Sequence, residues 1–170
     1  NYKRVGYTTE ALDKIVPAYF GGRTEAKITG EVVSDCIYSD ILSQYPTVSG
    51  LTGVWDYMYA KEIDIEEIPK SELPEVNDLS DPKTWEKISD YYVEIIPNNA
   101  TVPIRTPNIE DTTKVILANV EDSTQALTYH YMDIIGAQLL DNAENYEIIN
   151  AYKVVKKGEQ NLQPAKIGDV

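Results

Sequence analysis

The chain has 170 residues, enough for one domain with a single core, and its net charge of −13 argues against tight binding of nucleic acid by this piece alone. It contains one cysteine, Cys36, and one histidine, His130, which excludes an intrachain disulfide and a zinc site of the usual ligand types. Phosphate chemistry would therefore need divalent cations or basic groups from elsewhere.

The sequence has no apolar run as long as a membrane span and no N-terminal signal-peptide pattern. We therefore expect a cytoplasmic protein without membrane partners, located in the host cytoplasm if the source is viral. Because the first residue is Asn1 rather than Met, we also expect the chain to be a piece of a longer protein.

The first zone of the chain runs to about residue 59 and predicts a strand followed by a helix. Residues 27–38 are rich in β-formers, which places Asp40 at the end of the predicted strand. Pro46 suits the first turn of the helix, where a missing N–H costs nothing. The apolar face of this helix is predicted from side chains at helical spacing, namely Val48, Leu51, Trp55, Met58 and Tyr59.

The second zone runs from Glu62 to about Asp111. Its first part, residues 62–82, is acidic and interrupted by prolines, which predicts an irregular or loosely packed insert there. Within it, Asp81 followed by a proline is a helix-start signal. That short helix is expected to present one apolar face, made of Trp85, Ile88 and Tyr92. "YVEII" and "TVPIR" are typical of short strands, and Pro103 favours an edge or a bulge for the second.

The third zone begins near Thr112 and mixes strands with one helix. "KVILANV" and "ALTYHYM" predict two strands joined as a hairpin by the polar turn 121–124. "DIIGAQLLDN" predicts a helix with Asp133 as its N-cap, and "YEIINAYKVVKK" predicts a long strand. Because helices and strands do not alternate regularly, we expect an α+β fold with a mixed or antiparallel sheet and packed helices.

The turn after the predicted first strand has the chemistry of a nucleotide site. A carboxylate at a strand end, such as Asp40, is well placed to hold Mg²⁺, whose remaining positions are filled by phosphate and water. Consecutive backbone N–H groups at residues 41–44, near a helix start, attract phosphate oxygens. Tyr45 would stand beside such a site as a flat wall.

"DILSQYPT", residues 40–47, resembles motif A of the family B DNA polymerases, D-x-x-S-L-Y-P-S, with Gln44 and Thr47 as departures. "YFGG", residues 19–22, resembles the Y-x-G-G/A motif of the same family and ends 18 residues before Asp40. The four fixed residues of the first motif match by chance about once in 10⁵ starting points. The two motifs occur in the family's order, and "GGRTE" points to a divergent branch similar to phage or plasmid enzymes.

The resemblance implies a DNA-directed DNA polymerase that transfers nucleotides with two Mg²⁺ ions, with template–primer DNA and a deoxynucleoside triphosphate as partners. It implies that Asp40 and the Ile41 carbonyl bind the metals, and that Tyr45 stacks under the deoxyribose and excludes a 2′-hydroxyl. The triphosphate would be cradled by the backbone of Leu42, Ser43, Gln44 and Tyr45. The template strand would be contacted by Tyr19, Gly21 and Gly22, with Arg23 on a phosphate.

Several motifs of the family are missing from this chain. It has no D-T-D-like motif C and no motif B, so we do not expect it to polymerise DNA alone. The resemblance implies a palm segment over residues 1–61 and an inserted subdomain over residues 62–157. Residues 158–170 would be a tail or a return to the palm. In the protein-primed branch, an insert at this place contacts the priming protein.

Two other interpretations stay open. Asp40 can act as a helix cap or close an Asx-turn, which would make the chain a non-enzymatic acidic α+β interaction domain. A polymerase-derived module that lost catalysis and kept DNA or protein contacts is the intermediate case. His130 lies between tyrosines on a predicted strand, where a hydrogen-bonded structural histidine is expected more often than a catalytic base.

Overall fold

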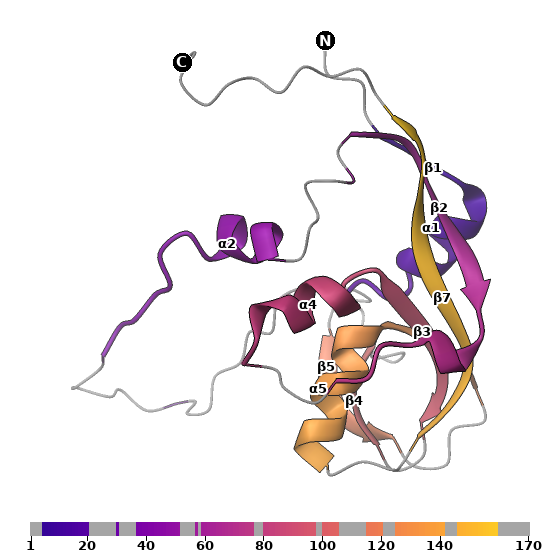
Figure 1. Cartoon of the computed structure of the whole chain (residues 1–170). Coiled ribbons are helices and arrows are strands. Elements are labelled where there is room, and N and C mark those ends of the chain that lie inside the picture. The colour runs from indigo at the N-terminus through magenta and orange to yellow at the C-terminus, as the bar shows by residue number, and fades with distance from the viewer. Residues whose placement is uncertain are drawn as a thin grey trace, which may run out of the picture.

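A computed structural model describes residues 5–20, 30, 37–51, 57, 59–76, 80–97, 100–105, 115–120, 125–141 and 146–159 (Figure 1). The first half of this part contains β1 (Gly6–Tyr7), α1 (Thr9–Ile15), α2 (Gln44–Leu51), β2 (Ala60–Ile68), the 3₁₀ turn η1 (Lys70–Glu72) and α4 (Pro82–Ile88). The second half contains β3 (Tyr91–Pro97), β4 (Ala100–Arg105), β5 (Val115–Val120), β6 (Leu127–His130), α5 (Tyr131–Asp141) and β7 (Tyr146–Glu159).

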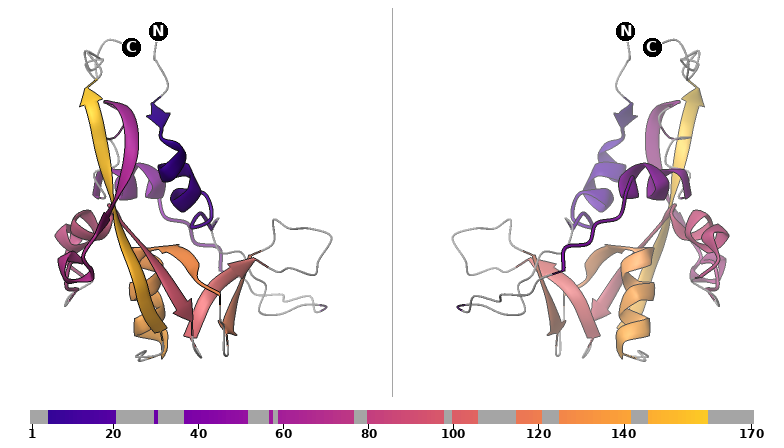
Figure 2. Two further views of the ribbon diagram at one scale, coloured as in Figure 1. Left: turned by 90° about the vertical axis from the view of Figure 1, so that its right-hand side faces the viewer. Right: turned by 90° about the vertical axis from the view of Figure 1, so that its left-hand side faces the viewer.

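The described strands form a five-stranded mixed sheet in the order β1-β2-β7-β3-β6 and a two-stranded sheet of β4 and β5. β1 pairs with β2 in parallel, and the other pairs are antiparallel. The long β7 joins β2 along one edge and β3 along the other. Figure 2 shows β2 and the end of β7 as an arm with α1 alongside, and the two-stranded sheet at the opposite end. The predicted α+β class is confirmed.

The prediction of an irregular insert is wrong for residues 62–68, because they belong to β2. Ile63 is buried and Ile65 half-buried, whereas Glu66 and Glu67 are exposed, so the strand buries its isoleucines and leaves those acidic groups in water. The predicted boundary between residues 61 and 62 falls inside this strand, which also pairs with β1. The division into segments 1–61, 62–157 and 158–170 stays a prediction.

The helix-start signal at Asp81 is confirmed. The Asp81 carboxylate accepts the backbone N–H of Lys83 at 3.0 Å, at the start of α4. Ile88 is buried and Trp85 half-buried on this helix. Tyr92, expected on the same face, instead lies in β3, because the helix ends at Ile88.

The predicted hairpin of "KVILANV" and "ALTYHYM" is wrong. β5 pairs with β4, and β6 pairs with β3 in a register that sets Tyr129 opposite Val93. The alternation of apolar residues determines which face of a strand is buried. It does not determine the partner, because any strand with a matching apolar face can pair with it. Pro103 lies in β4, in a sheet of only two described strands, which agrees with the edge position predicted for it.

The main core lies between β3, β6, β7, β4, α4 and α5. Its largest fully buried side chains are Tyr129, Ile88, Ile95, Ile134, Val93 and Val102. A smaller apolar cluster of Ala60, Ile63 and Val154 lies under α1 and receives Ile15 from it. The helix α1 therefore contributes apolar packing to the minor cluster, and it also contacts β6.

The start of α5 differs from the prediction, because Asp133 lies inside the first turn and not at the N-cap. The backbone N–H of Met132 is held by Nδ1 of His130 at 3.2 Å, and Nε2 of His130 contacts the Ser89 carbonyl oxygen at 2.8 Å. These two bonds require a neutral imidazole with its proton on Nε2. Burial lowers the pKa of His130 and raises the pKa of Asp133 to about 6.

Asp133→Asn is expected to stabilise the protein above pH 6 by about 2 kcal/mol. Ionisation of Asp133 against burial costs about 3 kcal/mol, of which the helix dipole returns up to about 1 kcal/mol. The raised pKa means that this carboxyl favours the folded state below its unfolded pKa of 3.8, and that the gain is lost as pH rises through about 6. Urea unfolding at pH 7.5 and pH 3.5 checks this, since the two proteins should differ only at the higher pH. Equal stability at pH 7.5 would contradict it.

Candidate functional site

The segment before motif A is exposed and irregular. Residues 37–41 have no ladder partner among the described strands, and Ile37 and Tyr38 are 97% and 90% exposed. The predicted strand over residues 27–38 is therefore wrong at its end; apart from Gly30, which lies in a bend, residues 27–36 lie outside the described residues. Asp40 thus follows an open loop rather than a strand end.

The helix that follows motif A is α2, and Pro46 lies in its first turn as predicted. Ser43 precedes the helix with a left-handed φ of 57°, and its carbonyl oxygen accepts the N–H of Thr47 at 3.0 Å. Val48 is 49% exposed, and Tyr59 lies in a turn before β2 rather than on the helix. The predicted apolar face is therefore wrong at Tyr59, and Trp55 and Met58 lie outside the described residues.

Asp40 itself is exposed, and its Oδ1 accepts the backbone N–H of Ile41 at 2.9 Å. One oxygen of the Asp40 carboxylate is therefore already hydrogen-bonded to the backbone of the next residue. In the part of the chain that the structure describes, no group of three or more His, Cys, Asp or Glu side chains is arranged to hold a metal ion. Asp40 is therefore not part of a metal-binding cluster of such side chains among the described residues.

The residues predicted to bind nucleotide form one exposed run with Asp40. Ile41 is 66% exposed, Leu42 93% and Tyr45 84%, and Ser43 and Gln44 are exposed between them. The Tyr45 ring is thus accessible to solvent. It lies beside the turn at Ser43, which is the non-glycine residue with a positive φ among the described residues. A flat ligand that reached this turn would find a carboxylate and an aromatic ring five positions apart.

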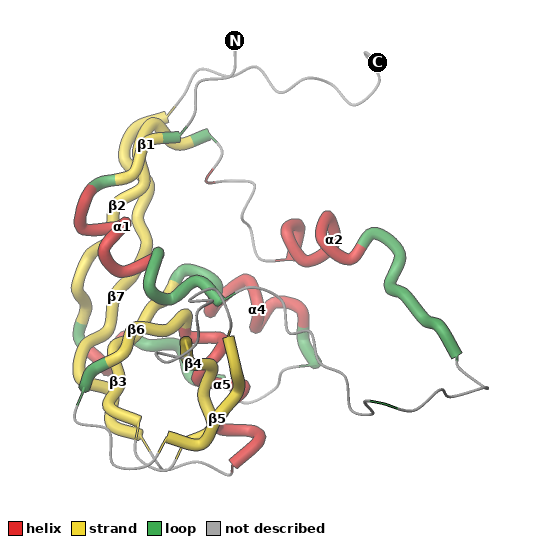
Figure 3. The backbone as a smooth tube through the Cα atoms, turned by 180° about the vertical axis from the view of Figure 1, so that it is seen from behind, coloured by secondary structure: helices red, strands yellow, loops and turns green. Residues whose placement is uncertain are grey.

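The second motif begins at the end of α1. Tyr19, whose N–H bonds to the Val16 carbonyl oxygen at 3.2 Å, is 72% exposed. The next residue, Phe20, is half-buried and stacks on Tyr129 with ring centroids 5.5 Å apart. Gly21, Gly22 and Arg23 lie outside the described residues. α1 and α2 are separated in Figures 1 and 3, so the two motifs stand on different parts of the molecule.

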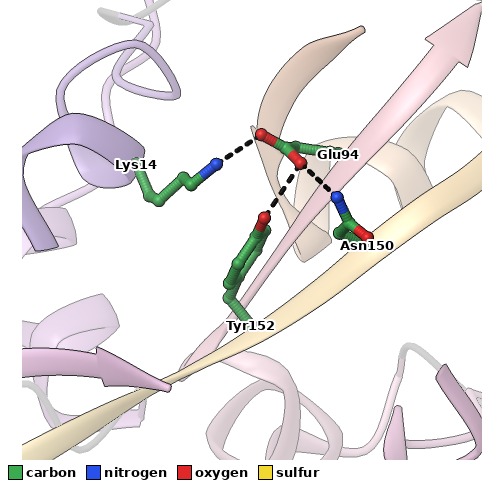
Figure 4. Close-up of polar contacts among 4 residues, drawn as sticks. All are labelled: Lys14, Glu94, Asn150 and Tyr152. Atoms are coloured by element: carbon green, nitrogen blue, oxygen red, sulfur yellow. Dashed lines mark hydrogen bonds and ion pairs between the residues drawn. The ribbon is translucent and has the colours of Figure 1, made fainter. Parts of the chain in front are cut away.

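A polar cluster that sequence reasoning missed joins α1 to the sheet (Figure 4). Lys14 Nζ lies 2.5 Å from Glu94 Oε1, while Glu94 Oε2 accepts hydrogen bonds from Asn150 at 2.7 Å and Tyr152 at 2.9 Å. Lys14 also lies over the Tyr152 ring, 4.7 Å from its centroid. Desolvation opposes both charges, but the hydrogen bonds outweigh it, so the pKa of Glu94 is lowered and that of Lys14 raised.

Comparison with models of known families gives no match, and neither curated proteins nor solved structures give one. Within the described residues, no helix has the length and apolar character of a membrane span. A functional assignment therefore depends on the two motifs and on the geometry of the residues that carry them.

Proposed function

We propose that this chain is the palm-like, motif A segment of a family B-like DNA polymerase. One observation carries the proposal: "DILSQYPT" forms an exposed turn and helix start in which Asp40 and Tyr45 are both accessible. "YFGG" supports it, because Tyr19 is exposed and precedes motif A in the family's order. The proposed location is the cytoplasm, of the host if the source is viral.

In this proposal Asp40 and the Ile41 carbonyl contribute ligands to the metal site, and the backbone of residues 42–45 faces the triphosphate. When bound, Mg²⁺ neutralises charge on the departing pyrophosphate and activates the primer hydroxyl. One carboxylate does not complete that site, so the proposal requires a second metal-binding carboxylate from a motif C elsewhere in the full-length protein. The part of the chain from β2 to β7 is proposed to contact DNA or a priming protein.

Tyr45→Ala tests the nucleotide role. The tyrosine ring is expected to block a 2′-hydroxyl, so its removal from the full-length protein should raise ribonucleotide incorporation relative to deoxynucleotide by about 10- to 100-fold. Primer extension with matched ATP and dATP series measures the ratio. Tyr38→Ala is the control, because Tyr38 is equally exposed and lies outside the motif. Unchanged discrimination in Tyr45→Ala removes Tyr45 from this role.

A second candidate is a non-enzymatic acidic interaction domain, or a polymerase-derived module without catalysis. The contact between Asp40 Oδ1 and the Ile41 N–H favours it, because a carboxylate closing its own turn has a structural role. These candidates predict that the full-length protein fails to extend a primer under any nucleotide and metal condition. Retained binding to primer–template DNA would then distinguish the polymerase-derived module from an unrelated domain.

A further inference from the structure

Three consecutive side chains at the junction of β6 and α5 each contact a backbone carbonyl oxygen in a different segment of the chain. The pairs are Tyr129 with Pro103 in β4 at 3.0 Å, His130 with Ser89 after α4 at 2.8 Å, and Tyr131 with Pro74 after η1 at 3.2 Å. Burial raises the pKa of both tyrosines, so they stay neutral in water near pH 7. Of the three side chains, His130 is therefore the one that can change its charge near neutral pH.

His130 also occupies the N-cap position of α5, which begins at Tyr131. Its Nδ1 accepts the backbone N–H of Met132, the second residue of the helix, at 3.2 Å. Backbone N–H groups in the first turn have no partner within the helix, and an N-cap side chain is their usual acceptor. A neutral ring with its proton on Nε2 makes this bond and the Ser89 contact together. A protonated ring carries a hydrogen on both nitrogens, so it keeps the Ser89 contact and can no longer accept the Met132 N–H.

The charged and titratable groups near the ring come from the turn before β3, from β3 and from α1. Asp90 attracts the imidazolium, but burial of the ring outweighs this attraction, so the pKa of His130 is lowered. The ring of Tyr92 meets the imidazole edge-on with centroids 4.9 Å apart, and burial raises the pKa of its hydroxyl to about 12. On the α1 side of the sheet, Lys14 and Glu94 are paired with each other. The ring is therefore neutral in the folded protein at pH 7.

Acid changes the charges of His130 and Asp133 in opposite senses at the start of α5. Because the pKa of His130 is lowered from 6.5, the neutral cap contributes stability above pH 6.5, and this contribution is lost as pH falls through the lowered value. Asp133, whose pKa is about 6, becomes neutral as pH falls, which removes the cost of its burial. The two effects on global stability offset each other. A positive charge nevertheless replaces a negative one at a helix start, where the helix dipole disfavours it.

We propose that His130 is a pH-sensitive cap of α5, which holds the first turn of the helix when neutral and releases the Met132 N–H when protonated. The expected response is a local opening of this turn, because Nε2 keeps its proton and its contact with Ser89. The helix α5 packs against β3, β4, β6 and α4, so the opening lies where both sheets meet the helix layer. The cap uses neither motif and does not depend on the proposed function.

An NMR titration of the full 170-residue chain, from pH 7.5 down to the onset of acid unfolding, tests the cap. At pH 7.5 the nitrogen shifts of the imidazole should show a neutral ring with its proton on Nε2. As His130 titrates, the protection of the Met132 amide against hydrogen exchange, corrected for the intrinsic pH dependence of exchange, is expected to fall by about 5-fold, the factor for loss of one cap. The amide of Val93, in the centre of β3, should not follow this step.

Two variants assign the step to His130. In His130→Asn, asparagine can accept the Met132 N–H without titrating, so the protection should show no step. Asp133→Asn is the matched control, because Asp133 titrates near pH 6, and it should keep the step. The proposal is overturned by a step that survives in His130→Asn or is lost in Asp133→Asn. A ring that is protonated on Nδ1 at pH 7.5, a ring that stays neutral until the chain unfolds, or Met132 protection that ignores the titration would each overturn it in the wild-type chain, even if His130→Asn fails to fold.

Discussion

Asp40→Asn is expected to lower primer extension by the full-length protein by about three orders of magnitude or more. The substitution removes the negative charge that a divalent cation needs, and several kcal/mol of transition-state stabilisation corresponds to about that factor in rate. Asparagine has nearly the same shape, and its amide oxygen still accepts the Ile41 N–H that Asp40 holds at 2.9 Å. The turn should therefore stay folded while the chemistry is lost.

Single-turnover extension of a labelled primer at saturating Mg²⁺ and deoxynucleotide measures this effect. Asp13→Asn is the matched control, because Asp13 is an exposed aspartate of α1 outside both motifs. The thermal unfolding midpoint of Asp40→Asn should stay within a degree or two of wild type, as for most exposed substitutions. If Asp40→Asn extends primers at the wild-type rate, Asp40 is not a metal ligand and its turn has a structural role.

Elements whose signals are local could be predicted from the sequence. The start of α4 follows from Asp81 and the proline after it, since one side chain and the next two residues contain the whole cap. β3 and β7 carry enough β-formers to be predicted without knowledge of their partners. Each of these predictions needs only a few consecutive residues.

Strand partners could not be predicted, because the pattern of a strand does not name its neighbour. β5 and β6 have the polar segment of a hairpin between them, yet Tyr129 of β6 lies opposite Val93 of β3. The prediction for the start of α5 was wrong for a similar reason. The backbone N–H of Met132 donates to the side chain of His130, which itself contacts Ser89. Both outcomes depend on residues about 40 positions apart.

In the candidate site, too, local motifs could be predicted from the sequence, whereas contacts between distant residues could not. The motif residues were selected from the sequence because their order and spacing are fixed over a few positions, and the structure leaves Asp40 and Tyr45 exposed. The contact between Lys14 and Glu94 joins residues 80 positions apart. Nothing in the sequence near Lys14 or Glu94 distinguishes these residues from ordinary charged surface residues. Such contacts between distant residues become visible only once the sheet brings them together.

Tyr129→Ala is expected to lower the free energy of unfolding by about 3–5 kcal/mol, the usual cost of truncating a large buried aromatic side chain. The side chain is fully buried, and three contributions are lost with it. The ring packs in the main core and stacks on Phe20, and its hydroxyl donates to the Pro103 carbonyl oxygen of β4 at 3.0 Å. Urea unfolding followed by circular dichroism measures the loss.

Tyr129→Phe separates these contributions, because phenylalanine keeps the ring and loses only the hydroxyl. It is expected to cost about 1 kcal/mol, the net value of one hydrogen bond. A loss above about 3 kcal/mol in Tyr129→Phe would mean that the bond to Pro103, rather than core packing, holds the two-stranded sheet against β6.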